Sequence, residues 1–219
     1  MIKRLLPLLL LILIGCSEPE PINMETMLIE RNDVWYTKDT NQPYSGPVFS
    51  LYDNGQLLEE LVLKDGEFHG LWKTYHENGQ LQTEVTFKDG KEDGPSKQYS
   101  KNGQILNEIT YKDGKEDGPS KEYYSNGKLK LEGTYKDGIP HGPVKNYFEN
   151  GQLQLEGTNK DGVPDGLWKS YNENGQLKVE GTLKDGELII RKIFQYYENG
   201  QLRYEQTYKD DELIDFKEY

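Results

Sequence analysis

The chain has 219 residues, of which 34% are hydrophobic and 29% are charged, and its formal net charge is −12. So acidic a chain disfavours nucleic acids and anionic lipid headgroups as partners. A single cysteine leaves no disulfide that could stabilise an exported fold, and cysteine chemistry is not available for catalysis if that residue carries a lipid.

The first fifteen residues have the pattern of a secretory signal. Lys3 and Arg4 precede an apolar run from Leu5 to Ile14, which is too short to span a bilayer as a stable helix. The run ends in Leu-Ile-Gly-Cys, which resembles the bacterial lipobox, where signal peptidase cuts before an acylated cysteine. An ordinary cleavage site and a membrane anchor are the alternatives. We predict a lipoprotein signal peptide at 1–15.

Cys16 is then the lipidation site, and residues 16–33 form the acylated start and a polar linker. Removing the two basic residues of the signal leaves 24 basic and 38 acidic residues, a mature net charge of −14. By resemblance to lipoproteins, Ser17 after the cysteine favours the outer membrane. We expect a lipid-anchored protein of the cell envelope, on the periplasmic side or the surface.

The rest of the chain, 34–219, is predicted to be a repeat array, because two dipeptides recur in one phase, with a spacing of 24 residues and one final step of 25. A leading half repeat spans Trp35 to Phe49. The Asn-Gly pairs begin at Asn54, Asn78, Asn102, Asn126, Asn150, Asn174 and Asn199. The Lys-Asp pairs begin at Lys64, Lys88, Lys112, Lys136, Lys160, Lys184 and Lys209.

Each Asn-Gly pair lies between two segments of alternating polarity, which predicts a β-hairpin with a two-residue type I′ turn. That turn opposes a lysine to a glutamate in five hairpins: Lys73 and Glu84, Lys97 and Glu108, Lys121 and Glu132, Lys145 and Glu156, Lys169 and Glu180. The first and last hairpins instead oppose Phe49 to Glu60 and Phe194 to Glu205. The Lys-Asp-Gly segments between hairpins predict wider turns.

Two faces follow from this register. One is a core face with Trp72, Leu81, Val85 and Phe87 in the second hairpin, Tyr124, Leu129, Leu131 and Tyr135 in the fourth, and Trp168, Leu177, Val179 and Leu183 in the sixth. Small residues oppose bulky ones there, Gly157 opposite Val144 and Gly181 opposite Trp168. The other face carries the Lys and Glu pairs. The candidate binding surface comprises Trp72, Tyr75, Tyr99, Tyr123, Tyr147, Trp168, Tyr171 and Tyr196.

Successive hairpins pair edge to edge, so we expect an all-β fold: an elongated single-layer antiparallel meander of about 14 to 16 strands. The segment from Tyr147 to Gly166, Tyr-x-Glu-Asn-Gly-Gln-Leu-x-x-Glu-Gly-x-x-Lys-Asp-Gly-x-x-x-Gly, resembles the bacterial MORN-repeat variant. The resemblance covers Gly46 to about Tyr219 and implies a groove-like aromatic binding face. Many members are labelled antitoxins of toxin-antitoxin pairs. The pattern departs at Ile189-Ile190 and at Asp211, and we expect the sheet to bulge or end before Asn199.

The Asp-Gly loops do not match a calcium loop, because Asp113 to Gly118 lacks an acid at the third position and Tyr124 stands where glutamate is needed. His69 and His141 lie three repeats apart, so no zinc site is expected from them or from His76. Every candidate acid is duplicated along the array, whereas an active site needs one special place. We expect no metal, no cofactor and no enzymatic activity.

The remaining function class is binding by a repeated surface. A protein partner could lie along the sheet or add a strand to an open edge. A cell-wall glycan could stack on the tyrosines, whose row has a purely structural explanation as well. Two chains could also form a homodimer through the apolar face. We expect a protein-binding or scaffolding surface, with an antitoxin-like neutralising protein and a glycan-binding module as alternatives.

Overall fold

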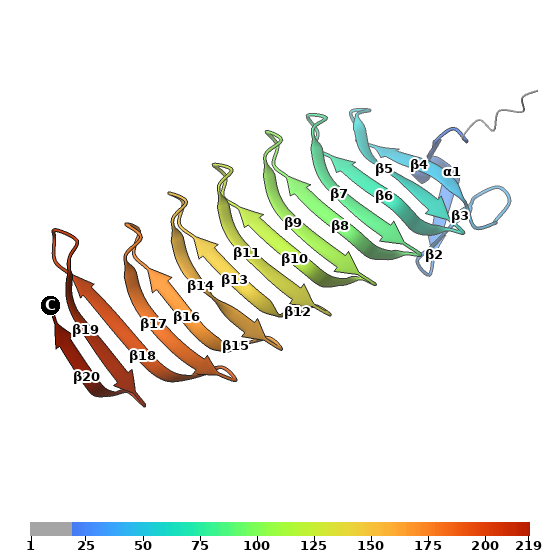
Figure 1. Ribbon diagram of the computed structural model, residues 1–219. Coiled ribbons are helices and arrows are strands. Elements are labelled where there is room, and N and C mark those ends of the chain that lie inside the picture. The colour runs from blue at the N-terminus through green and yellow to red at the C-terminus, as the bar shows by residue number, and fades with distance from the viewer. Residues whose placement is uncertain (1–18) are drawn as a thin grey trace, which may run out of the picture.

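The computed structural model describes residues 19–219, which form one long sheet and a small N-terminal cap (Figure 1). Fifteen antiparallel strands follow one another from β4 to β20 when two broken strands are counted once each. The first eight are β4 (Gly46–Leu51), β5 (Leu57–Lys64), β6 (Glu67–Tyr75), β7 (Leu81–Lys88), β8 (Lys91–Tyr99), β9 (Ile105–Lys112), β10 (Lys115–Tyr123) and β11 (Leu129–Lys136).

The second half of the array contains both broken strands. These are β12 (Ile139–Pro140) with β13 (Gly142–Tyr147), and β15 (Val163–Pro164) with β16 (Gly166–Tyr171). The remaining strands are β14 (Leu153–Lys160), β17 (Leu177–Lys184), β18 (Glu187–Tyr196), β19 (Leu202–Lys209) and β20 (Glu212–Glu218). Each strand pairs with the one before and the one after it, so the predicted antiparallel meander of tandem hairpins is confirmed.

The Asn-Gly loops are not the two-residue turns that the sequence predicts. Only the glycine of each pair has a positive φ, between 80° and 92°. In the second hairpin, Gly79 donates its N–H to the carbonyl of His76, and His76 donates to Gln80, each at 2.8 Å. This is a three-residue loop, a type I turn followed by a glycine bulge. The type I′ prediction for these loops is wrong.

The two-residue turns lie instead at the Asp-Gly sites, where wider turns are predicted. Asp113 and Gly114 both have positive φ, 50° and 78°, and Lys112 pairs directly with Lys115. A type I′ turn needs positive φ at both central residues. The final turn keeps this geometry without glycine, because Asp211 adopts a φ of 61°. The two loop types are therefore exchanged relative to the prediction.

The register of the hairpins agrees with the prediction over most of each strand. Lys73 opposes Glu84, and the four equivalent Lys and Glu pairs are also in register. Phe49 opposes Glu60, and Phe194 opposes Glu205. The same lysines also oppose the glutamates of the preceding hairpin, such as Lys97 with Glu84, so the two charges alternate from Glu60 on β5 to Glu180 on β17.

A second bulge, at Gln82 in the second hairpin and at the equivalent residues of the other hairpins, changes the face of one predicted core residue. Tyr75 pairs with Leu81 rather than with Gln82, because the register shifts between Thr74 and Tyr75. Paired residues share a face, so Leu81 lies on the face of Tyr75, and Leu129 and Leu177 do the same in their hairpins. The assignment of Leu81, Leu129 and Leu177 to the tryptophan side is wrong.

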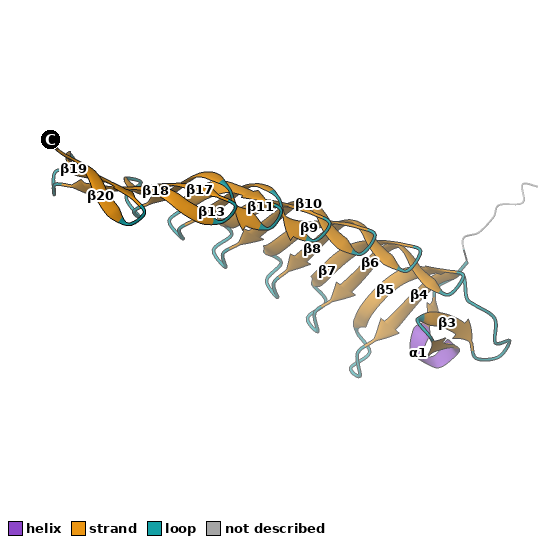
Figure 2. Cartoon of the chain, turned by 90° about the horizontal axis from the view of Figure 1, so that it is seen from below, coloured by secondary structure: helices purple, strands orange, loops and turns teal. Residues whose placement is uncertain are grey.

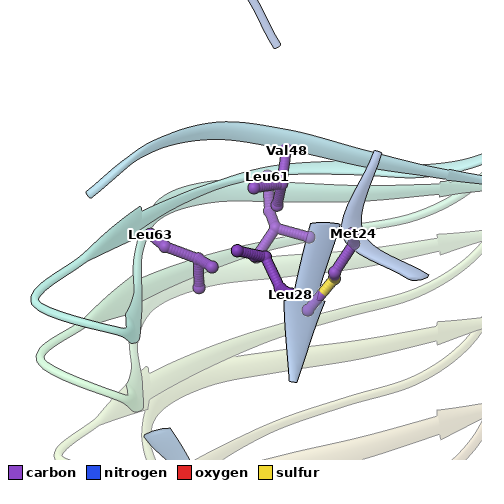
Figure 3. Packing of buried hydrophobic residues seen from close by; sticks show 5 residues of the cluster. All are labelled: Met24, Leu28, Val48, Leu61 and Leu63. Carbon is purple, nitrogen blue, oxygen red and sulfur yellow. The ribbon is translucent and has the colours of Figure 1, made fainter. Parts of the chain in front are cut away.

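We call the face with the Lys and Glu pairs the ladder face and the opposite one the tryptophan face. The buried core lies at one end of the tryptophan face and not along its length. Met24, Leu28, Val48, Leu61 and Leu63 form it, each at most 4% exposed (Figure 3). Val85 is also buried. Burial of side chains in the array is therefore concentrated where the cap covers the first strands.

The cap consists of β1 (Ile22–Asn23), α1 (Met24–Met27), β2 (Leu28–Arg31) and β3 (Val34–Thr37). β1 pairs in parallel with β4, and β2 pairs with β3 in a separate two-stranded sheet. Figure 2 shows α1 and β3 lying against one face of the sheet at its N-terminal end. The linker expected at 16–33 is thus folded from Ile22 onward, because Met24 and Leu28 find a buried place on the first hairpin.

The two C-terminal hairpins continue the sheet and do not end it. At the 25-residue step, Thr182 pairs with Ile190 and Leu183 with Leu188, which leaves one residue bulged in β18. A bulge is present in the earlier units too, where Val85 pairs with Ser96 and Phe87 with Glu92. The expected bulge is therefore found, but it is smaller than the equivalent bulges elsewhere, and β19 and β20 follow it.

Candidate binding surface

The ladder face carries one row of alternating charges across the sheet. Each lysine of the row stands between two glutamates on the neighbouring strands, as Lys97 stands between Glu84 and Glu108. Its Nζ atom lies 3.9 Å and 4.0 Å from their carboxylate oxygens. The side chains are partly exposed, so each pair contributes only about 0.2 to 1 kcal/mol. Together the ion pairs favour this strand register, since a slip by one residue would separate all of them.

Beside the charges runs a row of tyrosines, and their hydroxyls are already engaged. The hydroxyl of Tyr75 donates to Glu60 at 2.7 Å, and each of the next four hydroxyls donates to a glutamate of the preceding hairpin. These bonds join Tyr99 to Glu84, Tyr123 to Glu108, Tyr147 to Glu132 and Tyr171 to Glu156, at 2.7 to 2.9 Å. Tyr196 donates to the carbonyl of Leu177 at 2.9 Å. The tyrosine row therefore ties neighbouring hairpins together.

The electrostatics of this row follow from the same contacts. Burial and the hydrogen bond to Glu60 raise the pKa of Tyr75 to about 12, and the other four Glu-bonded tyrosines have pKa values of about 12 for the same reasons. The hydrogen bond from Tyr75 is also the largest cause that lowers the pKa of Glu60. The tyrosines are thus kept neutral and the carboxylate kept ionised.

Next to the charges lies a third row, which the sequence reading missed. Proline or leucine recurs every 24 residues and pairs with valine or threonine: Pro47, Leu71, Pro95, Pro119, Pro143 and Leu167 oppose Val62, Thr86, Thr110, Thr134, Thr158 and Thr182. Leu71 and Leu167 are 44% and 49% exposed. The 24-residue spacing of these positions was the signal that could have revealed an apolar stripe.

Between this stripe and the charges the ladder face is hollowed in three successive units. The hollows measure about 230, 270 and 260 Å³. The middle one is lined by Pro119, Lys121, Glu132, Thr134 and Pro143, among others, and its neighbours use the equivalent residues of the adjoining repeats. Each hollow combines an apolar wall with two lysines and one glutamate, and the arrangement repeats along the array.

The two tryptophans lie on the opposite face, away from the tyrosines. Trp72 packs with Phe68 and Phe87 beside the cap, and its Nε1 donates to Glu59 at 2.8 Å. Trp168 donates to the carbonyl of Thr158 at 3.1 Å, and its ring lies over Gly157. The eight candidate residues therefore do not form one surface: six tyrosines share the ladder face, and two tryptophans do not.

Both predicted pairs of a small and a bulky residue are present, but the ring of Trp168 lies over a different glycine from the one that it opposes. Gly157 opposes Val144, and Gly181 opposes Trp168. A Cβ at Gly157 would lie only 2.1 Å from the Trp168 ring, while at Gly181 the nearest side chain is Leu188 at 3.0 Å. Trp168 thus leans toward Gly157 on the preceding strand, and that glycine makes room for it.

Two of the histidines hold one repeated position, which contacts the next Asp-Gly turn. His69 lies 3.6 Å from Asp89 and His141 lies 3.5 Å from Asp161. The same position holds aspartate elsewhere, and Asp93 accepts the backbone N–H of Asp113. His76 has another position, where its Nε2 lies 3.0 Å from the carbonyl of Tyr99. Each histidine is engaged with the neighbouring hairpin.

The Asn-Gly loops are joined in a similar way. The side-chain amide of Asn78 donates to the carbonyl of Lys101 at 2.8 Å, and that of Asn150 donates to Glu173 at 2.9 Å. Within each loop, the asparagine oxygen accepts the N–H two residues later, as with Asn78 and Gln80. The recurring asparagine is therefore explained by contacts within and between loops.

Among residues 19–219, no three His, Cys, Asp or Glu side chains gather as a metal site would require. No helix in this part of the chain is long and apolar enough to cross a membrane. The predicted signal peptide and Cys16 lie outside the described residues. The lipid anchor therefore stays a prediction from the sequence.

A comparison with protein families matches six units of the array. The profile of the MORN repeat variant covers residues 68–89, 92–113, 116–137, 140–161, 164–185 and 192–210. A comparison with curated proteins found no match. Proteins built from such all-β repeats are typically not enzymes.

Proposed function

Since the chain belongs to the MORN repeat variant family, whose repeats are generally modules that bind proteins or membranes, we propose that it is a non-catalytic binding protein of the cell envelope. In this proposal a lipid on Cys16 holds the protein at a membrane. Ser17, the residue after the cysteine, favours the outer membrane. The array then presents the ladder face to a protein partner.

The observation that carries this proposal is the set of three equivalent hollows on the ladder face. Each offers an exposed proline or leucine beside a lysine and a glutamate. A protein segment can place apolar side chains against the stripe and polar groups against either charge, and equivalent hollows in series favour an extended partner. The tyrosine hydroxyls are bonded within the array, so the stripe and the charges are the groups that remain for a ligand.

The binding test compares two arginine substitutions at exposed strand positions. Thr158→Arg places a long side chain in the hollow between Pro143 and Leu167, whereas Gln98→Arg makes a comparable change on the tryptophan face. We expect the Cys16→Ser chain to retain a partner from envelope extract, Thr158→Arg to lose it and Gln98→Arg to keep it. Equal retention by both variants would argue against the ladder face.

The identity of what is retained separates the alternatives. One small protein recovered in a fixed ratio would favour an antitoxin-like neutralising role, which for an exported protein requires an exported or surface-acting toxin. Retention of cell-wall glycan in place of a protein would favour the glycan-binding alternative. A larger envelope protein would support the scaffolding role that we propose.

The anchor has its own test. The intact chain should fractionate with membranes and carry an acyl mass on the peptide that begins at Cys16. The Cys16→Ser chain should lose both properties. An unmodified Cys16 in a chain purified from membranes would contradict the anchor without bearing on the ladder face.

A further inference from the structure

The last strand of the sheet, β20, is paired on one side only. Tyr219 donates its N–H to the carbonyl of Arg203 on β19, at 2.9 Å. Because backbone groups alternate along a strand, Phe216 and Glu218 turn their N–H and C=O groups away from β19. Within residues 19–219, no strand pairs with that outer side. Unpaired backbone groups in such a row form a template for another strand.

The side chains of β20 are as accessible as its backbone. Four large apolar residues, Leu213, Ile214, Phe216 and Tyr219, are 52%, 58%, 50% and 60% exposed. The opposite end of the array has no such strand, because β1 pairs with β4 and the cap covers the adjoining face. Figure 1 shows the cap and the C-terminus at the two ends of the sheet. Within residues 19–219, the sheet thus has one edge covered by the cap and one edge, at β20, without a partner strand.

We propose that a second copy of this chain pairs with β20 in antiparallel orientation, about a two-fold axis at Phe216. Phe216 then opposes Phe216 of the partner subunit. Asp215 opposes Lys217 of the partner subunit, and by symmetry the same contact forms again. The outward-facing backbone groups of Phe216, with those of Glu218, supply hydrogen bonds between the two edges, on the near side of the bulge at Ile214.

The charges on β20 select this register over the alternatives. A two-fold axis can pass a hydrogen-bonded or a non-hydrogen-bonded pair, so the nearest alternatives to Phe216 are axes at Asp215 and at Lys217. An axis at Asp215 would oppose Asp215 to Asp215 of the partner subunit, and an axis at Lys217 would oppose Lys217 to Lys217 of the partner subunit. Only the axis at Phe216 opposes each Asp215 to a Lys217, and opposed unlike charges stabilise strand pairs while like charges destabilise them.

The closed end of the array limits the size of this assembly. A two-fold contact uses the same edge on both subunits and so closes on itself, and at the capped end β4 is already paired with β1. The product is therefore a dimer of two arrays joined tail to tail, and not a filament. It leaves both ladder faces free, so this pairing is independent of the ladder-face binding proposed above.

Charge exchange on β20 tests the register. In the full chain carrying Cys16→Ser, sedimentation over a range of concentrations should show a monomer–dimer equilibrium. Asp215→Lys alone or Lys217→Asp alone opposes like charges twice, and each should raise the dissociation constant by about tenfold. An equimolar mixture of the two variants opposes unlike charges again and should form a heterodimer with nearly the original dissociation constant.

A proline variant tests the use of the edge itself. Phe216→Pro removes an N–H that faces away from β19, so the intramolecular pairing is kept while the outer edge loses a donor. We expect this variant to be monomeric with an unchanged circular dichroism spectrum. A strictly monomeric parent chain, a mixture that does not restore pairing, or a dimer that survives Phe216→Pro would each overturn the proposal. The last result would favour contact through the tryptophan face.

Discussion

The hydroxyl of Tyr123 donates a 2.8 Å hydrogen bond to the carboxylate of Glu108, fifteen residues earlier in the chain. Tyr123→Phe removes this bond between neighbouring hairpins and leaves the ring in place. We expect the free energy of unfolding to fall by about 1 kcal/mol, since a single hydrogen bond of this kind has a modest net value. Urea unfolding followed by circular dichroism measures the change.

The matched control is Tyr111→Phe, one strand earlier. Tyr111 lies on the tryptophan face, and no hydrogen bond of its hydroxyl to another described residue is found. Its loss should change the free energy of unfolding by less than that of Tyr123→Phe. Equal losses in the two variants would show that the bond to Glu108 has no special value.

The tyrosine row predicts a loss of stability at alkaline pH. Tyr75, Tyr99, Tyr123, Tyr147 and Tyr171 have pKa values of about 12 in the folded chain, against about 10 in an unfolded one. The folded state holds these protons more tightly, so the stabilisation is complete below about pH 10 and is lost as the pH rises through about 12. Urea unfolding at several pH values should show this decline.

Absorbance of the phenolate form gives an independent measurement. The chain contains 16 tyrosines, and five of them should ionise late. Tyr123→Phe should reduce the late step and leave the earlier one unchanged. A single ionisation step near pH 10 for the folded chain would contradict the prediction.

The Asp-Gly turns predict a second sensitive position. Asp113 has a φ of 50°, a left-handed conformation that aspartate and asparagine tolerate better than other side chains. Asp113→Ala should lower the free energy of unfolding by about 1 to 2 kcal/mol, whereas Asp113→Asn should leave it nearly unchanged. Denaturant unfolding of the two variants would decide, and a neutral alanine variant would speak against strain at this turn.

The exchange of the two loop types shows what repetition in a sequence can and cannot predict. Asn-Gly and Asp-Gly both favour tight turns, and each pair alone is compatible with a type I′ turn. The register of Lys73 and Glu84 was predictable because a bulged residue, Gln82, offsets the extra residue of the loop, so that the pairing beyond it is the same as for a two-residue turn. The side of Leu81 was not, because the bulged residue Gln82 lies between Leu81 and the paired residues and reverses the alternation just beside the loop.

The cap and the binding surface were harder to predict for a different reason. Met24 and Leu28 are four residues apart, a helical spacing, but the helix spans only four residues and is fixed by contact with Val48 and Leu61. Such a segment has no repeat to support a prediction. The tyrosine row was predicted. The hydrogen bond from Tyr123 to Glu108 was not, because it joins strands of two neighbouring hairpins and depends on how those hairpins lie side by side.

Three successive repeats place glycine at the same position of the tryptophan face, and they predict different responses to one added methyl group. A Cβ at Gly157 would lie 2.1 Å from the ring of Trp168, while at Gly133 the nearest side-chain atom, in Val144, is 3.8 Å away. Neither glycine has a positive φ, so backbone strain does not enter. Gly157→Ala should cost about 1 to 3 kcal/mol by overpacking, and Gly133→Ala should be neutral or slightly stabilising. Unfolding in urea gives both values, and the emission of Trp168 should shift only in the first variant.

The double change Gly157→Ala with Trp168→Leu should recover most of the loss, because the smaller side chain leaves room for the methyl group. An equal cost at both glycines would mean that the ring of Trp168 does not lie over Gly157 in solution.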